Sequence, residues 1–239
     1  MGRKPKRVRD QDRSHAKGKS VAPAPRSLHH SGGAMVASGA GSSLGKLSEA
    51  LRSALLRALA ATPLQGPRWR EHSVAGQQGN ELPMVQLDLR GIRVHRDTWW
   101  LLLQQVVAHV AMDCPCCGAS VASHKIVTAD LNQVRPRAAI WPHQDVVIGG
   151  GGPSLLVLLQ PAQQGGHFRI ARGADVSWRE ADAGGLTLAQ RVRDTVYVPL
   201  QECGEVCCFD GCTYVHEVSR VYGSEPRLTV SVTLACGRT

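Results

Sequence analysis

Two histidines and one aspartate have the residue types and spacing that could bind a metal. His143 and Asp145 stand at i and i+2 in "IWPHQDVV" (140–147), so on a strand both side chains point to the same face. His216, in "TYVHEVSRV" (213–221), is on another expected strand. Two histidines and one carboxylate, with the other positions open, form the facial triad of non-haem Fe(II) enzymes. The alternative is a pair of structural histidines, which are more common on strands than metal ligands.

A second pair of candidate binding residues begins eleven residues after His216. Arg227 and Thr229, in "EPRLTVSVTL" (225–234), are also i and i+2 and share a strand face. A guanidinium fork and a hydroxyl can together bind a carboxylate. The alternative is an arginine that extends from a strand edge to water. Glu217, beside His216, is expected on the opposite face, in solvent.

These pieces resemble, in order and spacing, the 2-oxoglutarate- and Fe(II)-dependent dioxygenases. The resemblance covers residues 126–235 and rests on four stretches: "PHQD" (142–145), "PSLLVLLQPAQQGGHFRI" (153–170), "CFDGCTYVHEV" (208–218) and "VYGSEPRLTVSV" (221–232). It implies a double-stranded β-helix, or jelly roll, with helices supporting one face. It also implies iron held by His143, Asp145 and His216, and 2-oxoglutarate held by Arg227 with Thr229.

Two branches of this family share features with the chain. The "GG" at 165–166 and the turn "VYGSEPR" are similar to the prolyl-hydroxylase-like branch, which mostly acts on protein side chains. The stretch "LNQVRPRAAIWPHQD" (131–145) resembles the AlkB-type nucleic-acid demethylases, and Asn132 matches their pattern. Val134 stands where that pattern has tyrosine, and the pair of arginines far beyond the last histidine is absent. The prolyl-hydroxylase-like branch is therefore favoured.

The resemblance implies an enzyme that hydroxylates a C–H bond of a protein side chain. Oxidative decarboxylation of 2-oxoglutarate to succinate and CO2 would accompany the reaction, with O2 as co-substrate and ascorbate as reductant. Two alternatives stay open. One is a nucleic-acid oxidative demethylase with the same cofactors, and the other is a non-catalytic, zinc-stabilised binding module.

The eight cysteines motivate the zinc alternative. Cys114 and Cys117, in "CPCC" (114–117), have the C-x2-C spacing that is half of a typical zinc site. The second group, "CGEVCCFDGC" (203–212), has C-x3-C spacing, which fits less well. Structural zinc, redox-active thiols and free thiols all remain possible uses.

The elements that must position these residues follow from hydrophobic periodicity. Leucines three or four apart predict a helix over 43–61, which Pro63 ends. Alternation predicts a strand over 84–94, and "DTWWLLLQQVVAHVAM" (97–112) predicts a buried helix. Short β-type runs separated by Gly/Pro turns predict the remaining strands, at 126–134, 138–147, 154–160, 167–170, 195–200, 205–209, 213–221 and 227–235.

The predicted organisation is a disordered basic tail (1–41), a helical and mixed support region (42–125) and a mainly β catalytic core (126–239). The net charge is +9, and residues 1–20 alone hold eight Lys/Arg and two Asp. The tail is a candidate nuclear-localisation or nucleic-acid-contacting segment, or simply a solvated tail. We expect no membrane partner and an intracellular location, nuclear or cytoplasmic, because no long apolar stretch or secretory signal is present. The sequence does not predict the oligomeric state.

Overall fold

The structure is a computed structural model. It describes residues 42–66, 68–72, 84–90, 96–145, 152–171, 196–197 and 199–236. The predicted disordered tail (1–41) lies outside the described residues. Among the helices that are described, none has the length and apolar character needed to cross a membrane.

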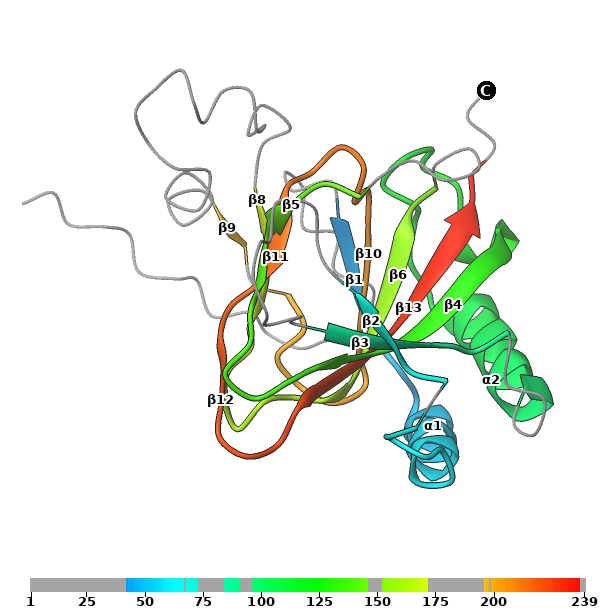
Figure 1. Cartoon of the computed structure of the whole chain (residues 1–239). Coiled ribbons are helices and arrows are strands. Elements are labelled where there is room, and N and C mark those ends of the chain that lie inside the picture. The colour runs from blue at the N-terminus through cyan, green and yellow to red at the C-terminus, as the bar shows by residue number, and fades with distance from the viewer. Residues whose placement is uncertain are drawn as a thin grey trace, which may run out of the picture. The chain divides into compact units, whose positions relative to one another are not determined.

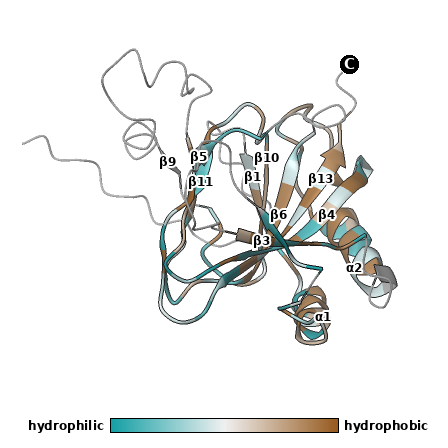
Figure 2. Cartoon of the chain, viewed as in Figure 1, coloured by the Kyte–Doolittle hydropathy of each residue, from teal (hydrophilic) through white to brown (hydrophobic). Residues whose placement is uncertain are grey.

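A seven-stranded antiparallel sheet forms the larger layer of the fold (Figure 1). Its strands, in spatial order, are β1 (Ser42–Lys46), β10 (Glu205–Phe209), β6 (Ser154–Gln160), β13 (Arg227–Ala235), β4 (Lys125–Val134), β3 (Met84–Asp88) and β2 (Arg70–His72). The longest strands, β13 and β4, pair along their whole length. Figure 2 shows apolar residues alternating with more polar ones along β13, because one face of the strand packs on the apolar core beneath the helices and the other faces away from it.

A four-stranded antiparallel sheet forms the smaller layer. Its order is β5 (Ile140–His143), β11 (His216–Val218), β8 (Phe168–Ala171) and β9 (Val196–Tyr197). A two-stranded ribbon pairs β12 (Val221–Tyr222) with β7 (Gln164–Gly165). One buried apolar cluster contains residues of both layers, for example Leu158 of β6 and Phe168 of β8. Two antiparallel sheets that enclose a shared core are the predicted jelly roll, so this fold prediction is confirmed.

Two helices support the larger sheet. The helix α1 (Glu49–Ala60) begins after Ser48, whose side chain accepts a hydrogen bond from the Leu51 amide. The second helix, α2 (Arg96–His109), contributes fully buried Trp99. The largest apolar cluster contains residues of both helices and of β4, β6 and β13. The helices therefore support the larger sheet, which carries Arg227 and Thr229, whereas His143 and His216 lie on the smaller sheet.

Several predicted elements have different bounds in the structure; for example, the helix predicted over 97–112 ends at His109, and the strand predicted over 138–147 is Ile140–His143 within the described residues. The helix predicted over 43–61 begins only at Glu49, because residues 42–46 form the edge strand β1 against β10. The strand predicted over 84–94 ends at Asp88, whose carboxylate accepts a hydrogen bond from the Arg90 amide in a turn. The stretch 213–221 is divided between β11 and β12. Strands β1, β2 and β3, which come from the predicted support region, belong to the same sheet as β4 and β13.

Candidate metal centre and adjoining pocket

The three predicted metal ligands meet at one point in the fold. Antiparallel pairing of β5 with β11 places His143 directly opposite His216, and Asp145 follows two residues after His143. The Asp145 Oδ1 atom lies 3.8 Å from His143 Nε2 and 3.5 Å from His216 Nε2. The two imidazole centroids are 4.2 Å apart. One ligand atom from each residue therefore converges within the reach of a single ion.

The hydrogen bonds of the two histidines fix their tautomers. His143 Nδ1 lies 2.7 Å from the Trp141 carbonyl oxygen, and His216 Nδ1 lies 3.1 Å from the Tyr214 carbonyl oxygen. A carbonyl oxygen only accepts, so each Nδ1 carries the proton and donates it. Nε2 is then the ring nitrogen that faces Asp145 and that is left to bind a metal. Hydrogen bonding of the distal nitrogen to a carbonyl is the usual arrangement behind a metal-binding histidine.

Gly211 and Ser154 hold the Asp145 carboxylate in place. The Asp145 amide donates to the Gly211 carbonyl oxygen at 2.8 Å, and Ser154 Oγ donates to Asp145 Oδ2 at 3.5 Å. A Cβ atom at position 211 would overlap Asp145 Oδ2. The carboxylate thus occupies space that only glycine leaves free. This role of Gly211 was not predicted, and the turn "FDGC" (209–212) is its only signal in the sequence.

The electrostatic surroundings of Asp145 favour its charged form. Burial opposes ionisation, but His216, His143 and the Ser154 hydroxyl outweigh it and lower the pKa of Asp145 to about 2. The carboxylate is therefore ionised at neutral pH. An ionised carboxylate that faces the Nε2 atoms of two histidines brings three metal-ligating atoms to one point.

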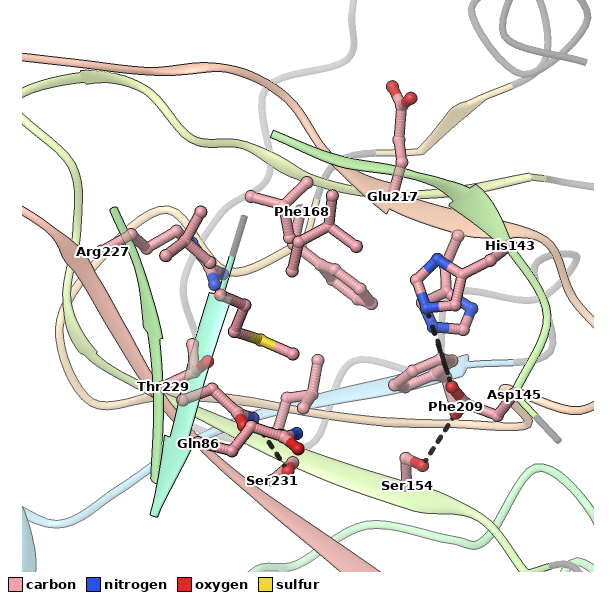
Figure 3. Close-up of a pocket in the computed structure, with 17 residues that line it drawn as sticks. Gln86, His143, Asp145, Ser154, Phe168, Phe209, Glu217, Arg227, Thr229 and Ser231 are labelled. Carbon is pink, nitrogen blue, oxygen red and sulfur yellow. Dashed lines mark hydrogen bonds and ion pairs between the residues drawn. The ribbon is translucent and has the colours of Figure 1, made fainter. Parts of the chain in front are cut away.

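A cavity of about 130 Å³ adjoins the three residues. It is far smaller than the roughly 300–1,000 Å³ of sites for drug-sized ligands, so it suits a small molecule. Figure 3 shows His143 and Asp145 at one end of this pocket and Arg227 and Thr229 at the other. Phe168 and Phe209 contact each other edge to face, with centroids 5.2 Å apart, and form an apolar wall.

Arg227 is a buried cation in this pocket. Its side chain is 2% exposed, and burial lowers the pKa of the guanidinium to about 10. Within the described part of the chain, its Nη2 atom has no hydrogen-bond partner. A buried charge with unsatisfied donors is costly unless a ligand supplies the acceptor. The predicted alternative, an arginine reaching water from a strand edge, is therefore wrong.

A row of polar side chains lies on the strands beside Arg227. Thr229 of β13 is 4% exposed and pairs across the sheet with Asn132 of β4. Gln86 of β3 donates to the Asn132 side-chain oxygen at 2.9 Å, and the Asn132 amide donates to Ser231 Oγ at 2.9 Å. Gln86 and Ser231 were not predicted. Ser231 continues the i, i+2 series of Arg227 and Thr229, whereas no sequence signal indicated Gln86.

Val134 and Glu217 also line the pocket. Val134 is 1% exposed, pairs with Arg227 across β4 and β13, and presents an apolar side chain to the pocket. Glu217 was expected in solvent, but it is 8% exposed. It accepts a hydrogen bond from Arg169 Nη1 at 3.0 Å, which compensates its buried charge.

Comparisons with known proteins agree with this architecture. No family model and no curated protein sequence matches the chain. Solved structures do match. A 2OG-Fe(II) oxygenase family oxidoreductase from Burkholderia pseudomallei has a TM-score of 0.52 at 13% identity, over 82% of this chain and 84% of that one. A Trichoplax adhaerens prolyl hydroxylase, in complex with a hypoxia inducible factor peptide fragment, has a TM-score of 0.53 at 12% identity, over 81% and 83%.

A third structure is the non-heme alpha ketoglutarate dependent carbocyclase SnoK from nogalamycin biosynthesis. Its TM-score is 0.52 at 14% identity, over 82% of this chain and 79% of that one. At such identities the likeness establishes the fold and not the reaction. The chain therefore has the double-stranded β-helix fold of the 2OG-Fe(II) oxygenases, as its sequence motifs predict.

Proposed function

We propose that this chain is an Fe(II)- and 2-oxoglutarate-dependent dioxygenase that hydroxylates a C–H bond. One observation carries the proposal. A single small cavity has three convergent metal-ligating atoms at one end and a buried guanidinium without a described partner at the other. A molecule that binds both ends must contact the metal and carry a distal anion.

The donor set fits Fe(II). Two neutral imidazole nitrogens and one carboxylate oxygen are the ligands of the facial triad, which leaves adjacent positions open. His143, Asp145 and His216 would hold the ion, and the Trp141 and Tyr214 carbonyl oxygens keep both imidazoles in the ligating tautomer.

The opposite end of the pocket fits the distal carboxylate of 2-oxoglutarate. Arg227 offers a donor that has no partner among the described residues, and Thr229 shares its strand face. A carboxylate there would satisfy the guanidinium in a two-pronged ion pair. The polar row of Gln86, Asn132 and Ser231 lies beside it and can accept or donate further hydrogen bonds.

The residues of the chain would bind the metal, orient the dicarboxylate and shield both from water. When bound, iron and 2-oxoglutarate would supply the oxidising power for C–H hydroxylation, as O2 is consumed and succinate and CO2 are released. Asp145 stays ionised, and His143 and His216 keep their Nε2 lone pairs available. Arg227 fixes the orientation of the dicarboxylate, while Phe168 and Phe209, whose rings pack beside His216, exclude water from the metal end of the cavity.

For the substrate we propose a protein side chain. Support comes from the prolyl hydroxylase of similar fold that was solved with a peptide fragment. SnoK, with a similar TM-score, is described as a carbocyclase from nogalamycin biosynthesis, so the fold alone does not select the substrate. The nucleic-acid alternative rests on Asn132 and on the basic tail, and the tail lies outside the described residues. It stays a prediction, as do ascorbate as reductant and a nuclear or cytoplasmic location.

The first test is spectroscopic. The protein is purified anaerobically, loaded with Fe(II) and titrated with 2-oxoglutarate. We expect a visible metal-to-ligand charge-transfer band in the wild type. Replacing both His143 and Asp145 with alanine should abolish iron binding and the band, with the circular dichroism spectrum unchanged. A wild type that binds no Fe(II) would contradict the proposal.

A second test addresses the substrate class. Succinate formation is measured with peptide libraries, with methylated DNA or RNA, and with small hydroxylatable metabolites. Stimulation by peptides alone supports the proposed class. Stimulation only by methylated nucleic acid would instead support the demethylase alternative, and stimulation only by small molecules would exclude a protein substrate.

A further inference from the structure

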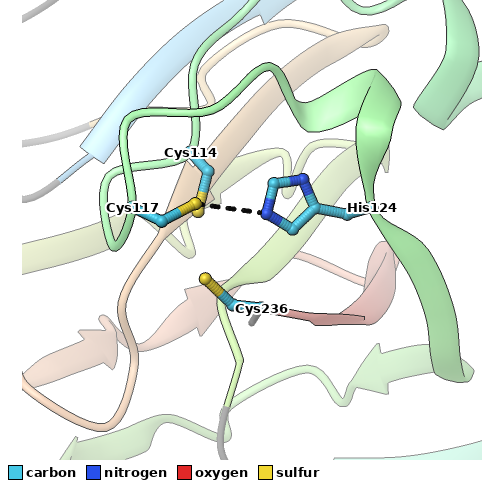
Figure 4. Close-up of side chains that lie close together, drawn as sticks. All are labelled: Cys114, Cys117, His124 and Cys236. Carbon is cyan, nitrogen blue, oxygen red and sulfur yellow. Dashed lines mark hydrogen bonds between the residues drawn. The ribbon is translucent and has the colours of Figure 1, made fainter. Parts of the chain in front are cut away.

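A second group of metal-ligating side chains lies outside the pocket. Cys114, Cys117, His124 and Cys236 each present one ligand atom, and the four atoms lie within 4.8 Å of one another. Figure 4 shows the three sulfur atoms and the imidazole turned toward a common point. None of the four residues lines the cavity beside His143. The group is therefore distinct from the candidate iron site.

The sheet brings the two distant parts of this group together. Ala235, at the end of β13, pairs with Lys125, at the start of β4. Cys236 directly follows Ala235 in the sequence, and His124 directly precedes Lys125. The strand register thus places a C-terminal thiol beside a histidine that is more than a hundred positions earlier in the sequence.

The loop after α2 supplies the other two ligands. Asp113 and Ser120 form an antiparallel bridge, and the Cys114 amide donates to the Ala119 carbonyl oxygen at 2.7 Å. Between these residues, the Gly118 amide donates a hydrogen bond to the Cys114 carbonyl oxygen at 2.8 Å and so forms a tight turn over 114–118. Gly118 has a φ of 71°, which glycine adopts without strain. This tight turn directs Cys114 and Cys117 to the same side.

His124 is held in the tautomer that a metal requires. Its Nδ1 lies 3.0 Å from the Ser120 carbonyl oxygen, so Nδ1 is the donor. Its Nε2 then carries the lone pair and lies 3.4 Å from Cys117 Sγ. In a tetrahedral zinc site, bond lengths of about 2.3 Å to sulfur and 2.0–2.1 Å to nitrogen place these two atoms about 3.5 Å apart. The observed separation matches that value.

We propose that Cys114, Cys117, His124 and Cys236 bind a structural Zn(II) ion. Three thiolates and one imidazole are a soft, four-ligand set that fills a tetrahedral ion completely. Such a site has no open position, so it stabilises the fold and does not take part in catalysis. On binding, each of the three thiols releases a proton and forms a sulfur–zinc bond.

The position of the site gives the ion a specific structural task. It would tie the loop after α2 and the first residue before β4 to the end of β13. That strand carries Arg227 and Thr229, which face the pocket from its other end. Zinc would therefore fix the C-terminal end of β13, the last strand in sequence order that the structure describes. This inference does not depend on the proposed enzymatic activity.

The test uses the full chain, purified without chelators, and measures zinc by elemental mass spectrometry. We expect one zinc per chain, retained when both His143 and Asp145 are alanine. Replacing zinc with Co(II) should give intense ligand-field bands and the sulfur-to-cobalt charge transfer of a three-sulfur, one-nitrogen site. Cys117→Ser and His124→Ala are the first variants, because both residues are less buried than Cys114 and less able to disrupt folding.

Matched controls separate this site from the other cysteines. Cys203→Ser lies in a different loop, and Cys116→Ser changes a thiol of the same turn that does not belong to the group. Both should retain zinc, whereas Cys117→Ser and His124→Ala should lose it or bind it at least tenfold more weakly. Stoichiometric zinc that is lost only when His143 and Asp145 are replaced would overturn the proposal. So would a wild type without zinc whose Cys117 and Cys236 are joined in a disulfide.

Discussion

His143 and His216 lie opposite each other on β5 and β11, and each donates its Nδ1 proton to the carbonyl oxygen two residues earlier in the chain. The same local hydrogen bond thus sets both rings before any ion binds. Because both Nε2 atoms face Asp145, the strand pairing itself builds the donor set. The geometry of the site is a property of the backbone register and needs no rearrangement of the rings.

The first prediction concerns the contribution of one imidazole. His143→Ala removes a donor atom at a half-buried position, so iron affinity should fall by more than the roughly 10- to 100-fold typical of residues behind a ligand. The measurement is anaerobic Fe(II) titration. His167→Ala is the matched control, because His167 is exposed and does not line the pocket. Equal iron affinity in the two variants would remove His143 from the ligand set.

The second prediction concerns the glycine behind Asp145. In Gly211→Ala the new methyl group would overlap Asp145 Oδ2 and push the carboxylate from its position. We expect iron affinity to fall by about 10- to 100-fold, since the change acts on the orientation of a ligand. Gly45→Ala is the control, because the nearest atom to its methyl group would be the flexible end of Met112, with Val110 at ordinary contact distance. If Gly211→Ala binds iron like the wild type, the carboxylate has room that the structure does not show.

The third prediction concerns pH and uses a pair of carboxylates away from both metal sites. Asp130 of β4 lies opposite Asp88 of β3. Burial and the Asp88 charge raise the pKa of Asp130 to about 6, against a smaller opposing effect of Arg90. The folded state therefore binds the proton more tightly than the unfolded chain. This contribution to stability is complete below about pH 4 and is lost as the pH rises through about 6.

Asp130→Asn should accordingly stabilise the protein more at pH 8 than at pH 4, relative to the wild type. Urea unfolding midpoints at the two pH values provide the measurement. Glu225→Gln, at an exposed turn, is the control and should show no such difference. A gain from Asp130→Asn that is equal at both pH values would mean that the Asp130 carboxyl is not perturbed.

The sequence predicted the strands and ligands that follow from local pattern. The strands at 154–160, 205–209 and 227–235 have the predicted bounds, because each is a short run of β-type residues between turns. The spacing of His143 and Asp145 likewise predicted that both side chains reach one site, although β5 ends at His143 and the hydrogen bond of the Asp145 amide to the Gly211 carbonyl oxygen, outside the strand, places the carboxylate. The resemblance in motif order then linked them with His216 and Arg227, and the fold brings all four to one pocket.

Features that depend on neighbours distant in sequence were not predictable. Gln86 reaches the pocket only because β3 pairs with β4, and nothing in "MVQLD" indicates that pairing. Glu217 was expected in solvent because the position of Arg169 on the adjacent strand cannot be read from a single sequence. Cys236 and His124 meet for the same reason, through the register of β13 with β4. In each case the missing information is which strands are adjacent.

The last prediction concerns the cost of the buried Arg227 charge. In Arg227→Met a similar volume replaces a desolvated cation whose Nη2 lacks a partner among the described residues. Without co-substrate, the variant should therefore be more stable than the wild type by about 1 kcal/mol or more. Binding of 2-oxoglutarate should be lost, because the variant has no donor for the distal carboxylate.

Thermal unfolding with Fe(II) under anaerobic conditions measures both effects. At about 100 times Kd, 2-oxoglutarate should stabilise the wild type by about 2.7 kcal/mol, or about 5–10 °C in Tm for a chain of this size. Arg227→Met should show no shift, whereas Arg90→Met, which removes an exposed ion pair with Asp88, should keep it. A full shift in Arg227→Met would place the dicarboxylate elsewhere. A variant that is much less stable than the wild type without co-substrate would mean that Arg227 has a partner in the chain and stabilises the fold. An arginine that is paired only by a ligand should instead destabilise the protein when the ligand is absent.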